Sequence, residues 1–200
     1  MWKHANHSWG GARLVAFCFI IQTLLPGATS ESSGHSRVFK SQKYGFSVYY
    51  PRNWRLSSKG DAFQIFNFPS SRAVRGAVLP RDGAGISVAV PDEMAPLKGG
   101  GGGSPIESLE GWVQIESGLY GFQPLGQRRL EVAGGSSSVT GIELIGVSGT
   151  GAVAIESVDW FFTAGRRMFL VSLYYRRGNP GAAKLREILK DVALSVIPTA

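Results

Sequence analysis

The stretch YGFSVYYPRNW, residues 44–54, decides the fold of this chain. Phe46, Val48 and Tyr50 recur at every second position, which is the pattern of a strand that buries one face. The proline that follows cannot donate a hydrogen bond to a neighbouring strand, so we expect the strand to end there. Trp54 comes next, and we expect its large side chain to fold back over the core as a packing lid.

The first 30 residues differ in kind from the rest of the chain. Lys3 and Arg13 precede a largely apolar run, residues 14–25, and small residues follow as far as Ser30. This order is typical of a secretory signal peptide, and we expect cleavage after Ser30. The run is shorter than the roughly 20 residues that cross a bilayer as a helix, so a retained anchor is the less favoured alternative. The chain is therefore expected to be secreted or periplasmic.

Cleavage of the signal peptide would remove most of the residues that nucleophilic and metal chemistry uses. It would remove the single cysteine, Cys18, and leave His35 as the one remaining histidine. This composition argues against a disulfide framework, a thiol nucleophile and a serine-histidine site, and no cofactor is expected. We expect residues 31–41 to be a flexible N-terminus and residues 42–198 to form a single domain. The chain is expected to be a monomer.

Three expected strands precede a long glycine-rich loop. The first lies in residues 44–54, and alternation or apolar runs predict two more at residues 62–68 and 85–90. Residues 97–104 contain five successive glycines, a composition that makes a mobile connector. The lysine that a phosphate-binding loop requires after its last glycine is missing, so nucleotide binding is not expected.

Two amphipathic helices are expected. Ser104 with Glu107 has the spacing of a capping box, which predicts a helix that starts at Ser104 and stops near Gly118. Asn179 is expected to cap a final helix. The apolar residues of that helix lie at helical spacing and should dock on a sheet: Leu185, Ile188, Leu189, Val192 and Val196.

The second half of the chain is rich in expected strands, near residues 127–132, 138–147 and 152–162, separated by glycine-serine turns. Residues 168–175 are apolar on both faces, which predicts a central strand covered on both sides. Gly165 is expected to take the left-handed position of a bulged turn before that strand. The order of elements predicts an α+β fold, an α/β/α sandwich with a central antiparallel sheet.

The opening strand, the helix after an irregular loop, the aromatic hairpin and the closing helix together resemble the PsbP-like superfamily, which includes the extrinsic PsbP subunit of photosystem II. The resemblance spans about residues 42–198 and is sharpest at residues 44–54. It implies a PsbP-like α/β/α sandwich that acts as an exported, non-enzymatic binding or accessory domain. The chain has no match to the acidic and histidine-bearing segments that the photosynthetic proteins use around manganese or calcium.

Carboxylates offer one route to an active site. Glu156 and Asp159 share an expected strand, but their odd spacing puts them on opposite faces, so they cannot form a catalytic dyad. Several acidic residues gather in sequence, although no loop has the alternating oxygen ligands of a dedicated calcium motif. They are Asp92, Glu93, Glu107, Glu110 and Glu116. We therefore assign no catalytic or metal residue.

Arginines offer a possible contact with a partner. Three pairs, Arg128-Arg129, Arg166-Arg167 and Arg176-Arg177, are interpreted as solvated strand ends. The better candidates for a partner contact are Arg72, Arg75 and Arg81, because loops carry function more often than strand ends do.

Five aromatic residues are expected to pack in the core, with a ligand cleft as the alternative: Tyr49, Trp54, Trp112, Trp160 and Tyr174.

The sequence thus favours an exported, non-enzymatic domain that contacts a protein or an envelope component. Nucleic acid is not expected as a partner, because export would separate the chain from nucleic acid and because the basic residues are scattered along the sequence. Two alternatives stay open: an extrinsic subunit of a membrane complex that binds calcium, and a hydrolase that works without histidine.

Overall fold

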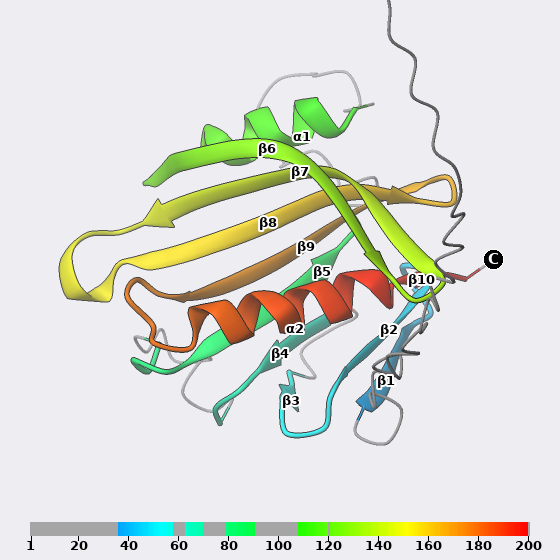
Figure 1. Cartoon of the computed structure of the whole chain (residues 1–200), viewed down its shortest axis with the longest axis horizontal. Helices are drawn as coiled ribbons and strands as arrows, with labels where there is room; N and C mark the ends of the chain where they lie inside the picture. The colour runs from blue at the N-terminus through cyan, green and yellow to red at the C-terminus, as the bar shows by residue number, and fades with distance from the viewer. Residues whose placement is uncertain (1–35, 58–62, 70–78, 91–107, 120, 200) are drawn as a thin grey trace, which may run out of the picture. The chain divides into compact units, whose positions relative to one another are not determined.

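The structure is a computed structural model, and it describes residues 36–57, 63–69, 79–90, 108–119 and 121–199. All of these belong to one compact unit, Ser32–Ala200 (Figure 1). The expected signal peptide and glycine-rich loop lie outside the described residues. Within the described part of the chain, no helix is both long enough and apolar enough to cross a membrane.

The strands form two sheets, and all of the strand pairs are antiparallel. The smaller sheet has the order β1-β2-β10, with β1 at Ser36–Ser41, β2 at Phe46–Pro51 and β10 at Ile197–Pro198. The larger sheet has the order β3-β4-β5-β9-β8-β7-β6. Its strands are β3 at Arg55–Leu56, β4 at Phe63–Phe66, β5 at Ala84–Ala89, β6 at Phe122–Gly134, β7 at Ser137–Ser148, β8 at Ile155–Ala164 and β9 at Arg167–Arg176.

Strand β9 lies in the middle of the larger sheet, as its apolar character on both faces predicts. On one face Phe169, Val171 and Leu173 are fully buried in the main core. On the other face Leu170 packs against a second, smaller core. The described part of the fold is therefore mostly antiparallel sheet with two helices, which confirms the expected α+β class.

The two helices pack on opposite faces of the larger sheet. Helix α2, Ala182–Leu194, buries Leu185, Leu189 and Val192 in the main core. Helix α1, Leu109–Ser117, contacts β6, β7 and β8 and buries Val113 in the smaller core. Figure 1 shows β6 and β7 bending toward the C-terminal part of α2, where Leu194 lies against Gly134.

The starts of both helices differ from the predictions. The cap of α1 is Ser108, whose side chain accepts a hydrogen bond from the Gly111 amide, so the prediction of a start at Ser104 is wrong. Asn179 does not cap α2, which begins after Gly181.

The side chain of Asn179 instead accepts a hydrogen bond from the Gly181 amide at 2.8 Å and donates one to the Gly83 carbonyl at 3.4 Å. Asn179 therefore joins two loops at this end of the sheet.

Two other local predictions are wrong. Residues 36–41, expected to be flexible, form β1, because their backbone pairs with β2 along its whole length. The turn between β8 and β9 has no bulge, since Ala164 pairs directly with Arg167. Gly165 nevertheless takes the expected left-handed backbone, with φ of 61°.

The opening motif packs as predicted. Phe46, Val48, Tyr50 and Trp54 are all buried, and Trp54 is only 2% exposed. The Trp54 amide donates to the Pro51 carbonyl at 3.1 Å, which closes the turn that folds the indole back. Tyr49 points the other way and is 45% exposed, so the expectation of core packing is wrong for this residue.

Replacing Trp54 with alanine should cost about 3 to 5 kcal/mol of unfolding free energy, because it leaves a large cavity in the main core. Urea denaturation measures this loss. Tyr49→Ala on the same segment is the control and should change stability by only about 0.5 kcal/mol. Equal effects of the two substitutions would contradict the burial of Trp54.

Candidate functional site

A groove of about 400 Å³ lies between the sheet and one side of α2. Val158 and Trp160 of β8 and Glu143 of β7 form its floor, because all three point toward the face that α2 covers. Residues of β6 form one wall and residues of α2 form the other. The bend of β6 toward the C-terminal part of α2 brings the two walls together at Gly134 and Leu194 (Figure 1).

The floor contains a buried carboxylate with a donor on each oxygen. Glu143 is 2% exposed, and its Oε2 accepts a hydrogen bond from Trp160 Nε1 at 2.9 Å. Its Oε1 accepts from Arg128 Nε at 2.5 Å. Burial of an ionised carboxylate is costly unless it is paired, so this network lets the charge lie within the fold. The hydrogen bond and the charge of Glu143 raise the pKa of Arg128 above its ordinary value.

Arg128 is fixed at its Nε atom and open at its tip. Its side chain is 71% exposed although its partner Glu143 is buried. Among the described residues, nothing bonds to its two terminal nitrogens. A guanidinium tip that presents its two terminal nitrogens matches the geometry of a carboxylate. Glu143 therefore holds a preformed donor at the mouth of the groove.

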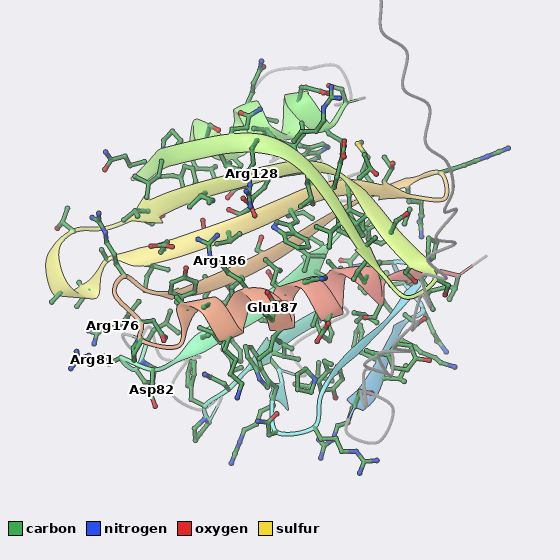
Figure 2. The ribbon with its side chains drawn as sticks, in the orientation of Figure 1. Arg81, Asp82, Arg128, Arg176, Arg186 and Glu187 are labelled. Carbon is green, nitrogen blue, oxygen red and sulfur yellow. The ribbon has the colours of Figure 1, made fainter. Side chains whose placement is uncertain are left out.

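Helix α2 supplies the opposite wall. Arg186 Nη2 lies 3.4 Å from Oε1 of Glu156 on β8. The same oxygen accepts a hydrogen bond from the Tyr175 hydroxyl at 2.6 Å. Burial and this hydrogen bond to Glu156 raise the pKa of Tyr175 to about 12. Figure 2 shows Arg128, Arg186 and Glu187 along the same part of the molecule, from the sheet to α2.

Both signs of charge line the groove. Three cationic side chains, Arg128, Arg186 and Lys190, and two acidic side chains, Glu143 and Glu187, belong to its lining. A polyanion would meet repulsion as well as attraction in such a groove. The lining is instead complementary to a segment that carries both signs of charge together with apolar surface, as a polypeptide does.

A second buried carboxylate lies on the opposite face of the sheet. Asp159 is 3% exposed and accepts a hydrogen bond from the Ser157 hydroxyl at 2.8 Å and another from Ser172. Burial outweighs these bonds and raises the pKa of Asp159. Burial, and then the charge of Asp159, also raises the pKa of Glu116 on α1. Glu156 and Asp159 thus occupy opposite faces, as their spacing predicts.

Of the predicted partner residues, Arg72 and Arg75 lie outside the described residues. Arg81 is exposed in the turn before β5 and is not part of the groove lining. Figure 2 shows Arg81 well apart from Arg128 and Arg186.

The arginine pairs divide into two kinds. Arg167 and Arg176 lie at opposite ends of β9, as predicted. Arg128 and Arg129 lie in the middle of β6, so the interpretation of this pair as a strand end is wrong. One signal in the sequence could have located the groove: Glu143 is the single charged residue in the otherwise apolar strand near residues 138–147.

The structure describes two of the five acidic residues that were considered for calcium. Glu110 and Glu116 belong to α1, whereas Asp92, Glu93 and Glu107 lie outside the described residues. Among the residues that the structure describes, no group of three or more histidine, cysteine or acidic residues is placed to hold a metal ion.

Comparison with known proteins identifies solved structures of low sequence identity. A crystal structure from Bacteroides thetaiotaomicron VPI-5482 matches with a TM-score of 0.48 and 13% identity, over 83% of this chain and 49% of that chain. This chain thus spans about half the length of that protein. Cyanobacterial PsbP (CyanoP) from Synechocystis sp. PCC 6803 matches with a TM-score of 0.43 and 11% identity, over 82% of this chain and 92% of that chain.

LpqN of Mycobacterium tuberculosis, described as involved in cell envelope biogenesis, matches with a TM-score of 0.43 and 15% identity, over 83% of this chain and 91% of that chain. No protein-family model matches the sequence, and no curated protein matches it. A PsbP protein is thus among the structural neighbours of this chain.

Replacing Glu143 with glutamine should destabilise the protein by about 1 to 3 kcal/mol. Both carboxylate oxygens accept hydrogen bonds, and an amide can accept at only one of the two positions. Urea unfolding measures the loss, with the exposed Glu131→Gln as the matched control. A Glu143→Gln protein as stable as the control would show that the network does not hold in solution.

Replacing Asp159 with asparagine should raise the melting temperature at neutral pH. The folded state favours the protonated form of Asp159, because its pKa is raised there. Its ionisation therefore removes stability as the pH rises from the unfolded-state pKa through the folded-state pKa. The advantage of asparagine should shrink in acid, where aspartate is protonated in both states. Melting curves across the acidic range test this, and an advantage independent of pH would contradict it.

Proposed function

We propose that this chain is an exported, non-enzymatic binding domain with a PsbP-like α/β/α sandwich, and that it binds a protein partner in the groove between β6 and α2. The observation that carries the proposal is the exposed tip of Arg128, which the buried Glu143 fixes at the mouth of the groove. A side chain held in place before binding loses little conformational entropy when a partner arrives.

The surroundings of Arg128 support a polypeptide as the partner. The lining has both signs of charge together with apolar residues, among them Val132 of β6 and Trp160 of β8. Charged rims around an apolar centre are typical of surfaces that bind proteins. An envelope component would be recognised by the same groove if it carried an anionic group for Arg128.

The proposal of a binding role rather than catalysis is supported by the positions of two carboxylates on β8. Glu156 is engaged by Tyr175 and Arg186 on one face, whereas Asp159 faces α1 on the other. A pair of carboxylates on opposite sides of a sheet cannot act on one bond.

Site-specific photocrosslinking in the native cell envelope tests the proposed function. A photoreactive residue in place of Glu187 should crosslink a discrete protein, because Glu187 lies on the rim of the groove. The same residue in place of Arg52, which is exposed beyond the end of β2, is the control. Adding Arg128→Gln should reduce the yield from position 187 by about tenfold, whereas Arg129→Gln should leave it unchanged.

Two results would overturn this proposal. Crosslinks from position 81 but none from position 187 would move the contact to the turn before β5. A failure to crosslink any protein, together with a melting temperature raised by a small-molecule panel, would replace a protein partner with a small ligand.

A further inference from the structure

Strand β6 is an open edge of the larger sheet. It is 13 residues long, and among the described residues it pairs with β7 alone. In an antiparallel pair, every second residue directs its N–H and C=O groups away from the neighbouring strand. Most residues of β6 are exposed, so this row of backbone groups is accessible beside the groove.

The part of β6 able to accept another strand has clear limits. Pro124 lacks an N–H group, and the pairing of β6 with β7 shifts between Pro124 and Gly126. After that irregularity, the ladder runs without a break from Gly126 to Gly134. Arg128 and Val132 of this regular part line the groove. The accessible backbone and the groove thus belong to the same surface.

The side chains of β6 set the character of an added strand. Leu130 and Arg128 point to the face that α2 covers, where Leu130 is buried and Arg128 meets Glu143. By alternation, Arg129 and Glu131 point to the other face. Directly opposed residues of antiparallel strands share a face. On the first face, an added strand would therefore place an apolar side chain opposite Leu130 and an acidic one opposite Arg128. On the second face, it would place an acidic side chain opposite Arg129 and a basic one opposite Glu131.

We infer that an extended segment of the protein partner adds to the free edge of β6 as a further strand, with an acidic side chain against the terminal nitrogens of Arg128. The inference rests on the proposed function, because it names how a protein would occupy the groove. Backbone pairing supplies affinity in this mode of recognition, and side-chain contacts supply specificity.

The charges on this edge do not guard it as charges on edge strands usually do. Glu143 pairs with Arg128 at its Nε atom, and Arg129 and Glu131 have opposite signs. The whole chain has a formal net charge of +7, which favours an acidic segment over a second copy of the chain.

A designed peptide tests the inference. The sequence Thr-Val-Lys-Val-Glu-Glu-Thr, blocked at both ends, places a glutamate opposite Arg128, a second glutamate opposite Arg129 and a lysine opposite Glu131. Titration into ¹⁵N-labelled protein should shift the β6 amides and the Trp160 indole N–H signal. Two further versions are N-methylated at every second residue, one at the odd-numbered residues and one at the even-numbered residues. Each of these two phases keeps every charge of the peptide but loses about half of its N–H donors.

The expected result is that one methylated phase binds like the parent peptide and the other binds at least about tenfold more weakly, because only one phase faces β6. Arg128→Gln should weaken the parent peptide by about tenfold, whereas Arg129→Gln, which points to the other face, should weaken it less. The Trp160 indole signal in each free variant reports that the fold is intact.

Three outcomes would overturn the inference: equal binding of both methylated phases, no binding at millimolar peptide, or a concentration-dependent dimer that the peptide dissociates, which would assign the edge to a second copy. If crosslinking from position 187 still captured a protein, the proposed function would stand and only strand addition would fail.

Discussion

Two adjacent strands buried on both faces are the constraint on which this structure depends. β8 and β9 bury apolar side chains above and below the sheet, so each face needs its own cover. Helix α2 covers β9 on one face, and α1 covers β6, β7 and β8 on the other. On the α2 side, β6 and β7 bend toward the helix at the end near Leu194. The space that remains beside Arg186 and Lys190 is the groove.

The buried carboxylate links this architecture to recognition. Glu143 lies on the floor of the groove, where an uncompensated charge would destabilise the fold. Its two donors come from the strands on either side, Arg128 on β6 and Trp160 on β8. The same network therefore stabilises the sheet and aims the tip of Arg128 outward. A partner that binds this tip would therefore meet a side chain that the folded protein already holds in place.

Much of the fold could be predicted from local patterns, because those patterns report burial. The apolar run of β9 and the alternation in residues 44–54 both predicted their places correctly. The start of α1 could not be read in this way, since serine is a favoured cap and the sequence offers one at both 104 and 108. Strand β1 was not predicted, because it is held by backbone pairing with β2 and because few of its own residues are buried.

The groove could not be predicted from the sequence, because it depends on the register of β6 and β7, which local patterns do not contain. Arg128 meets Glu143 because a two-residue turn after Gly134 fixes how β6 and β7 pair. The glycine-serine turn is visible in the sequence, but the contribution of α2 is set by tertiary packing. Arg186 and Lys190 are therefore unremarkable until the helix is placed beside the sheet.

Amide hydrogen exchange on the complex with the natural partner tests most directly the claim that the groove between β6 and α2 is the binding surface. Binding should slow the exchange of the β6 amides from residue 126 to residue 134 and leave β1 unchanged. Protection of α1 or of the turn at Arg81, with β6 exchanging as in the free protein, would contradict the claim.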